Sequence, residues 1–582
     1  KAGTPRTLKL SELNSNWAYN ITATNPSAAA YDQTTTDNYG ITSYRTAPDG
    51  TQQAVPWKVV GYSVDNGANW TTVKPTWLTA LSAESGNGGT AADQGTATLT
   101  KDITDLLAKR NNELKTATPL GSTSNPYDLS TKGGSVVRST ANSYVISAPG
   151  VYRIPLVYGN AIENGNDNPS SYRTSNAGTY ILSNFQDHEG HAITDPWIEK
   201  TNSGANNGVN GAEVVWADAA NLVHSPSITH VGGEGFLDFE VIAADIQSGN
   251  AVVAVTKGSG ASKTVLWSWH LWFAPKDALS TIAVTNYQGK TYNFTKETLG
   301  WKLVLWNGST YSSARTVKVK VEQTVANNST KQAAVINITQ NPGGVKKGAT
   351  TLYQFGRKDA FPGVAKADLA SNSHFTENAG NNMSIQNGIQ HPGSFYTWGS
   401  SWWSTPPTGY SYDNLWSADN TGVGLNDNSV VKTVYDPCPV GFKMPPTKAF
   451  SGFTSNGQND GTMNVDGTDN LQTFQSNFGH NLWTSSSKTA TINFPASGFR
   501  YYNDGSLNNV GNNGYYWSAV PNNTNNGCNL NFNSGNVNPL NNNTRTYGFA
   551  VRAVSEFTAW HVDELTRKSA IIIYYHPLLL NQ

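Results

Sequence analysis

The chain has 582 residues and a formal net charge of -1, from 39 Lys and Arg against 40 Asp and Glu. A charge so close to zero, without a basic cluster, argues against nucleic acid or an anionic membrane surface as a partner. Only 14% of the residues are charged, whereas there are 54 glycines and 26 prolines, which favours short strands joined by turns over long helices.

The length predicts several domains rather than one core. No run of about 18 apolar residues occurs, so we expect no membrane-spanning helix. The sequence starts at Lys1, which we interpret as the result of a removed export signal, with a trimmed chain as the alternative.

Residues 1–125 alternate strand-like runs with turn signals, and we predict a β-sandwich there. The runs Trp57–Val64 and Trp70–Val73 are separated by Asp-Asn-Gly-Ala-Asn at 65–69, which indicates a tight turn. The stretch Lys101–Lys115 carries apolar residues near helical spacing and predicts one of the few helices.

Residues 126–280 predict a second β-sandwich with short strands bounded by Pro-Gly and Gly-Asn turns. In Leu266–Phe273 the two-residue period of a strand places Trp267, Trp269, Leu271 and Phe273 on one face, which we assign to the core. The other face carries Ser268, His270 and Trp272. We interpret it as buried under the next domain, with a ligand surface as the alternative.

Residues 281–349 predict a small inserted β-sandwich. Thr316–Glu322 alternates Val with charged residues, as a half-exposed strand does, and Ala333–Thr339 is its expected partner. A linker is expected at 345–350.

Side chains that could carry chemistry lack the spacing of known catalytic sites. His188 and His191 do not have the spacing of a zinc-protease helix, and His224 and His230 have no cysteine companions, so we place these histidines in loops. No nucleophile elbow or phosphate-binding loop is present. Three acids in turn-like contexts are expected to cap turns, with paired carboxylates for glycoside cleavage as the alternative: Asp413, Asp419 and Asp436. We therefore predict a protein that is not an enzyme and needs no cofactor or metal.

Five segments of the C-terminal third carry a family resemblance. In chain order they are Tyr353–Gly363, Tyr435–Pro446, Phe494–Arg500, Gly514–Ser518 and Tyr547–Arg552. As an ordered set they resemble the Fibrobacter succinogenes major paralogous domain, a C-type-lectin-like module of exported proteins in Bacteroidetes. The resemblance covers roughly residues 350–556.

The resemblance implies a mainly β chain, in which tandem immunoglobulin-like or fimbrillin-like β-sandwiches precede a C-type-lectin-like α+β module. Cys438 and Cys528 both fall in that module, and either one disulfide or two buried thiols are expected. The triplets of calcium-dependent lectins are missing, so their sugar site is not expected.

An aromatic insertion within the module is the predicted ligand site, because such rings offer large apolar faces with polar edges. Its rings are Tyr396, Trp398, Trp402, Trp403, Tyr410, Tyr412 and Trp416. The alternative is that they fill a small loop-rich core.

The tail 557–582 contains Ser569–Tyr575, a β-prone run that is apolar on both faces and needs cover on both. We interpret it as a strand within its own chain, with a donor strand for a neighbouring subunit as the alternative.

The resemblance implies an exported cell-surface adhesin at a fimbrial tip, on the cell surface or outer membrane, that binds a glycan or a host or bacterial surface protein. The alternatives are a pilus structural subunit that joins other pilus subunits by strand addition, and a glycan-capture surface lipoprotein.

Overall fold

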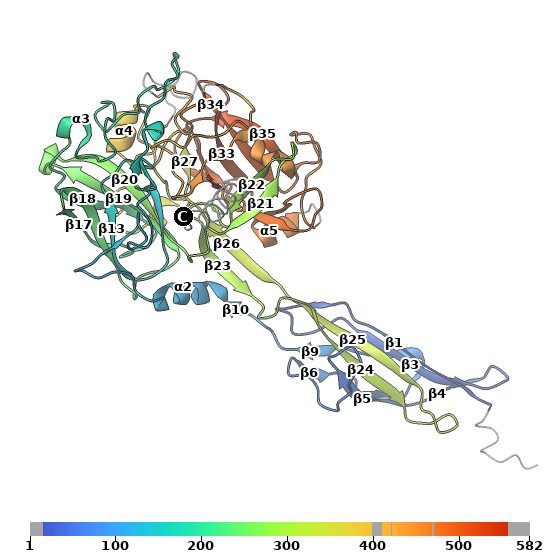
Figure 1. Ribbon diagram of the computed structural model, residues 1–582. Helices are drawn as coiled ribbons and strands as arrows, with labels where there is room; N and C mark the ends of the chain where they lie inside the picture. Colours follow the sequence, from blue (N-terminus) through green and yellow to red (C-terminus); the bar gives the residue numbers. More distant parts are fainter. Residues whose placement is uncertain (1–15, 398–409, 421, 468–470, 557–582) are drawn as a thin grey trace, which may run out of the picture. The chain divides into compact units, whose positions relative to one another are not determined.

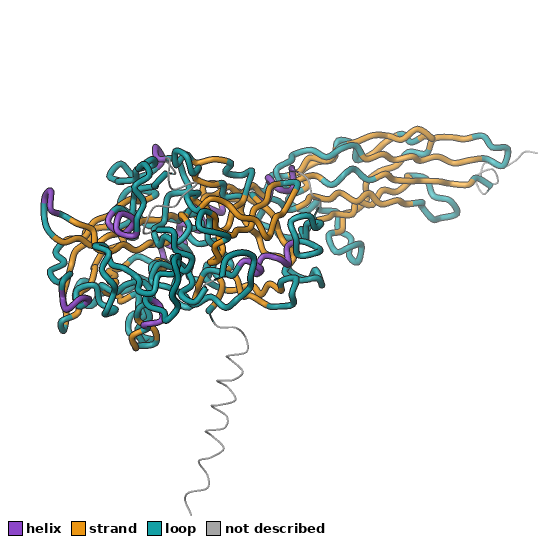
Figure 2. The backbone as a smooth tube through the Cα atoms, turned by 90° about the horizontal axis from the view of Figure 1, so that it is seen from above, coloured by secondary structure: helices purple, strands orange, loops and turns teal. Residues whose placement is uncertain are grey.

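The computed structural model describes residues 16–397, 410–420, 422–467 and 471–556. These residues form a mainly β protein with many short strands and few helices, as expected (Figures 1 and 2). None of their helices is long and apolar enough to cross a membrane. The predicted tail strand Ser569–Tyr575 lies outside the described residues.

The described chain divides into two compact units rather than the five predicted segments. The smaller unit combines the residues up to Leu106 with Trp306–Val345, and the larger one combines Leu107–Leu305 with the residues from Lys346 onward.

The smaller unit contains two main sheets. One holds β1 (Ala18–Thr24), β3 (Tyr39–Thr46), β4 (Gln52–Ala54) and β8 (Gly89–Gly95). The other runs in the order β2 (Ala29–Ala30), β25 (Ala333–Asn341), β24 (Arg315–Gln323), β5 (Trp57–Ser63) and β7 (Ser85–Gly86). A further pair is formed by β6 (Leu78–Leu81) and β9 (Ala97–Leu99).

The hairpin of β24 and β25 confirms the predicted pairing of Thr316–Glu322 with Ala333–Thr339. The predicted separate sandwich at 281–349 is wrong, because β24 also pairs with β5 of the first segment. The hairpin joins that sheet because Val317 and Val319 bury against the core around Trp57, and a lone hairpin cannot bury its apolar face.

Local signals in this unit, and in the segments where the chain passes to the larger unit, are observed as expected or nearly so. In the predicted turn, the Asp65 carboxylate accepts the backbone N–H of Asn69 at 2.9 Å, and Gly67 has a φ of 93°. The predicted helix begins later, as α2 (Leu106–Thr116), because Thr104 and Asp105 form strand β10. The expected linker at 345–350 is instead part of β26 (Gly344–Ala349).

In the larger unit, residues 126–280 hold two four-stranded sheets (Figure 1). The first has the order β11 (Tyr127–Asp128), β13 (Gly150–Pro155), β18 (Glu234–Val241) and β17 (His224–Val231). The second has the order β12 (Ser143–Ile146), β20 (Thr264–Phe273), β19 (Gly249–Lys257) and β16 (Gly211–Ala217). Smaller elements are β14 (Ile162–Glu163), β15 (Asn166–Asp167) and α3 (Thr201–Gly204).

The C-terminal part of this unit has four small sheets. They are β21 (Thr281–Thr285), β22 (Thr291–Thr295), β37 (Val554–Ser555) and β28 (Phe442–Lys443); β27 (Tyr353–Gln354), β36 (Gly548–Phe549), β31 (Phe499–Arg500) and β32 (Leu507–Asn508); β33 (Gly514–Pro521), β34 (Asn526–Asn533) and β35 (Asn536–Thr544); and β29 (Gly479–Trp483) with β30 (Thr491–Pro495). The remaining elements are β23 (Lys302–Gly308), α4 (Ile385–Gln390) and α5 (Leu471–Asn477). Because β22 pairs with β37, residues 281–295 belong with the C-terminal part.

Strand β20 joins the two parts of the larger unit, and both of its faces are buried as predicted. On the second face, the Ser268 hydroxyl donates to Asp359 at 3.1 Å and the Trp272 indole N–H donates to the backbone carbonyl of Trp301 at 2.9 Å. His270 lies 3.3 Å from the Tyr353 hydroxyl through its Nδ1. Because the polar groups of this face have hydrogen-bond partners, the face is buried without leaving them unsatisfied.

Candidate ligand-binding surface

The predicted aromatic site is largely core. Tyr396, Tyr410 and Trp416 are 4%, 2% and 0% exposed, so the prediction that they bind a ligand is wrong. Trp416 donates its indole N–H to the carbonyl of Tyr435 at 3.1 Å, and the Tyr410 hydroxyl donates to the carbonyl of Phe355 at 2.6 Å. A loop-rich module needs large rings to fill its interior, and these rings do so.

Three rings of that set, Trp398, Trp402 and Trp403, lie outside the described residues. Tyr412 is partly exposed, and its backbone carbonyl accepts a hydrogen bond from Arg545 at 2.6 Å.

The two cysteines are buried and form no disulfide. Burial raises the pKa of the Cys438 thiol well above its ordinary value and that of Cys528 to about 11, so neither is a reactive thiolate at neutral pH. The Asp436 carboxylate instead organises the proline-rich stretch by accepting the N–H groups of Cys438 at 2.7 Å and Met444 at 2.9 Å.

The other two acids expected to cap turns make side-chain contacts instead. Asp413 forms an ion pair with Arg545 at 2.8 Å, and Asp419 accepts a hydrogen bond from the Thr174 hydroxyl at 2.9 Å.

Within the described ranges, no three His, Cys, Asp or Glu side chains are close enough to share an ion. His188 and His191 flank a turn closed by Asp187, in agreement with a loop. The loop assignment of His224 and His230 is wrong, because both lie on β17 and pair with acids, Asp245 and Glu199, at 2.8 Å.

A cluster of five partly exposed rings lies on the C-terminal part of the larger unit. Its members are Phe499, Tyr501, Tyr502, Tyr515 and Tyr547. The ring centroids of Tyr501 and Tyr502 are 4.5 Å apart, those of Tyr502 and Tyr547 4.9 Å, and those of Phe499 and Tyr515 5.1 Å. The distances and tilts are those of favourable aromatic pairs.

A buried aromatic layer supports this cluster. Phe549 of β36 stacks on Tyr515 at 4.7 Å and on Tyr547 at 5.1 Å, and its other neighbour, Trp517, lies at 4.3 Å. The Trp517 indole N–H donates to the carbonyl of Tyr353 at 2.7 Å, which fixes the layer in place. Rings held on a packed support lose little freedom when they bind a ligand.

Asparagines continue the same face of the sheet across β34 and β35. Asn531 lies directly opposite Tyr515, and the Asn538 side chain donates to Asn531 at 2.8 Å. Asn529 donates in the same way to Asn543 at 3.1 Å. Asparagine disfavours strands, and these cross-strand amide pairs offset that preference.

We call the five rings and the partly exposed Asn531, Asn538 and Asn543 the aromatic–asparagine surface; Asn529 is fully buried and is not part of it. The surface contains no charged side chain, and burial raises the pKa of Tyr515 and of Tyr547, so their hydroxyls remain neutral donors and acceptors. Flat ring faces beside amide groups suit the apolar faces and hydroxyls of sugars, or a polar protein surface. Sequence reasoning missed these rings; the run Phe-Arg-Tyr-Tyr at 499–502 was the available signal.

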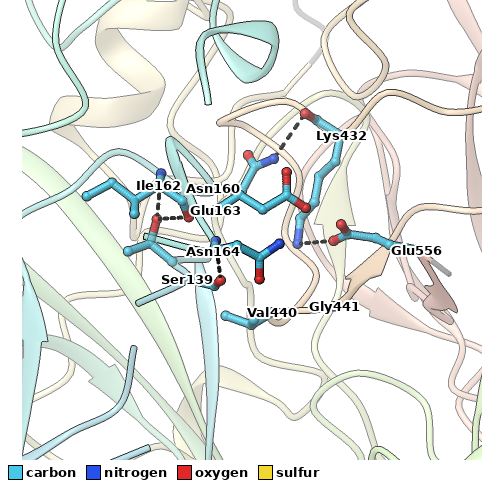
Figure 3. A pocket seen from close by; sticks show the side chains of 10 residues that line it. Ser139, Asn160, Ile162, Glu163, Asn164, Lys432, Val440, Gly441 and Glu556 are labelled. Carbon is cyan, nitrogen blue, oxygen red and sulfur yellow. Dashed lines mark hydrogen bonds and ion pairs between the residues drawn. The ribbon is translucent and has the colours of Figure 1, made fainter. Parts of the chain in front are cut away.

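A small pocket elsewhere in the unit is structural (Figure 3). Its volume is about 70 Å³, and the Lys432 ammonium occupies it by donating to Glu556 at 3.3 Å, with Glu163 close by. A second donation, to the carbonyl of Pro439 at 2.9 Å, satisfies the buried ammonium. Lys432 therefore connects the proline-rich stretch, through Pro439, with the end of the described chain, through Glu556.

Comparison with known families gives one match. A family model described as "Domain of unknown function (DUF8237)" matches residues 480–554, a segment that includes the whole aromatic–asparagine surface. Searches of curated proteins and of solved structures gave no match.

Proposed function

We propose that the protein is an exported cell-surface adhesin that binds a glycan or a partner protein through the aromatic–asparagine surface. The observation that carries this proposal is the cluster of five partly exposed rings on a rigid aromatic support. Single exposed rings are ordinary on a protein surface, whereas a contiguous group of exposed rings is typical of a binding site. A pilus-tip position agrees with the family resemblance of the C-terminal segments.

The proposal is tested on a glycan and mucin array with the purified chain and a Tyr501→Ala/Tyr502→Ala variant. Each ring at the centre of a binding site typically contributes about 2 kcal/mol, so we expect at least a thirtyfold loss of affinity. Tyr180→Ala and Tyr287→Ala remove exposed rings outside the surface, 42% and 56% exposed, and serve as matched controls. Equal binding of the variant and the controls would refute the assignment.

A second candidate is a pilus subunit assembled by strand addition. Strand β22 pairs with β37 at only one position, Phe294 with Val554, and a groove of about 570 Å³ runs beside Thr291 and Asn293. Lys290 and Asp427 face each other across it at 2.9 Å. A strand could extend the sheet there through backbone hydrogen bonds.

The candidate is tested with a synthetic peptide of residues 569–580 and the chain truncated after Glu556. Peptide binding that is blocked by Thr291→Pro would support strand addition, because proline cannot donate a backbone hydrogen bond. Absence of peptide binding would refute strand addition at this groove.

A further inference from the structure

A groove on the first sheet of the larger unit is separate from the aromatic–asparagine surface. It has a volume of about 530 Å³ and lies over β11, β13 and β18, next to the glycine turn at 133–134. Its size falls in the range of small-molecule sites.

The floor of the groove is a stack of rings and guanidinium groups. Phe236 is 4% exposed, and two guanidinium groups lie over its ring, that of Arg153 at 4.7 Å and that of Arg138 at 5.6 Å from the ring centroid. Ion pairs hold both arginines: Arg138 with Glu234 at 2.9 Å and Asp128 at 3.2 Å, and Arg153 with Asp238 at 2.9 Å. These ion pairs restrict the two guanidinium groups to one position each, so the floor is preorganised.

The charges in the groove balance. Asp128 and Glu234 offset Arg138 and Arg153 among the lining residues, and Asp238 adds a further acid beside Arg153. An anionic ligand would therefore meet carboxylates whose charge offsets the arginines, whereas a neutral ligand meets no such repulsion.

Three polar groups around the floor have spare hydrogen-bonding capacity. Within the described part of the chain, no partner is found for the Tyr127 hydroxyl, for Oε1 of Glu234 or for Nη1 of Arg153. Burial raises the pKa of Tyr127, so its hydroxyl remains a donor as well as an acceptor. Arg153 offers a donor, Glu234 an acceptor, and Tyr127 both. A sugar hydroxyl both donates and accepts, so it can pair with any of the three.

We propose that this groove is a second ligand site, which takes a neutral oligosaccharide whose hydroxyls pair with Tyr127, Glu234 and Arg153. The inference rests on the proposed attachment function and deepens it, because two sites on one chain raise the avidity for a repetitive glycan.

The test uses the full chain and four neutral probes: cellotetraose, maltotetraose, tetra-N-acetylchitotetraose and lacto-N-tetraose. Binding is measured by ligand-observed NMR and calorimetry. Tyr127→Phe keeps the ring, which contacts Tyr152 at 5.9 Å, and removes only the hydroxyl. Loss of one hydrogen bond predicts about a tenfold weaker affinity for the bound probe. Tyr180→Phe, which changes an exposed tyrosine elsewhere in the unit, is the matched control.

The Glu234→Gln variant provides a second measurement that leaves Arg138 paired with Asp128. We expect it to weaken the same probe, with thermal unfolding used to verify the fold. The proposal is overturned if none of the four probes binds, if both variants bind the probe as tightly as the parent chain, or if a sulfated tetrasaccharide binds more tightly than the neutral probes.

Two further variants separate this site from the aromatic–asparagine surface. Tyr501→Ala/Tyr502→Ala should weaken array binding at least thirtyfold yet leave tetrasaccharide binding in the groove unchanged. The reverse pattern, array binding lost through Tyr127→Phe alone, would support the groove and refute the proposed role of the aromatic–asparagine surface.

Discussion

Lowering the pH should destabilise the larger unit through one buried imidazole, that of His270 on β20. The ring is 2% exposed, with Nε2 at 2.9 Å from the Asn250 side chain and Nδ1 at 3.2 Å from the Ser143 hydroxyl. Burial lowers its pKa from 6.5 to about 3, because the charged form would be desolvated. The folded state therefore keeps His270 neutral over the pH range in which the unfolded chain takes up a proton.

The size of the effect follows from linkage. The pKa of His270 is lower in the folded state than in the unfolded chain. Its contribution to the unfolding free energy is therefore fully present above the unfolded pKa and is lost as the pH falls toward the folded pKa. Between pH 7 and pH 5 this single group should cost about 2 kcal/mol of unfolding free energy.

The assay is urea denaturation of the parent chain and of His270→Gln at both pH values, with the transition of the larger unit analysed separately. The His270→Gln chain should lose about 2 kcal/mol less than the parent chain between pH 7 and pH 5. His191→Gln removes an imidazole that is 58% exposed and controls for the loss of a histidine. The same pH dependence in the parent and the His270→Gln chain would refute the reasoning.

Three further predictions concern stability and the cysteines. Asp359→Ala leaves the buried cations Arg357 and Lys358, which pair with Asp359 at 2.8 and 2.6 Å, without a counter-charge; we expect a loss of about 3–5 kcal/mol in urea denaturation, and a loss below about 1 kcal/mol would contradict this. Gly505 has a φ of 76° and an added Cβ would lie 1.8 Å from a backbone oxygen, whereas Gly289 with a φ of 81° has open space; Gly505→Ala should therefore lower the melting temperature more than Gly289→Ala, and equal shifts would argue against the close packing. A thiol reagent should label no cysteine in the native chain and both in urea, since both thiols are buried and free; no label in urea would indicate a disulfide between them.

Local patterns in the sequence predicted local structure well. The alternation of Val and charged residues in Thr316–Glu322 found both the strand and its hairpin partner, because both signals depend on neighbours in sequence. The same holds for Leu266–Phe273, where apolar residues on both faces required cover on both faces.

Features that depend on distant contacts were missed. Nothing in Trp57–Val64 indicates that β24 will be its neighbour, since the pairing is set by shape and core volume in the assembled sheet. Ring identity likewise does not reveal burial: Trp416 and Tyr501 look alike as sequence signals, yet one fills the core and the other is partly exposed. Strand β17 was not recognised in the sequence because it lacks an alternation of apolar and polar residues. Two of its side chains, His224 and His230, instead form ion pairs with acids that are distant in sequence.

The pairing of β5 with β24 also has a consequence for biosynthesis. Tyr62 of β5 finds its partner Val319 only after the intervening residues of the larger unit have been made. At ribosomal rates this delay is roughly 10 to 50 seconds. During that time the edge of β5 that pairs with β24 lacks its neighbour, and an unpaired strand edge favours aggregation. A holding chaperone that recognises this segment would therefore protect the nascent chain until the hairpin arrives.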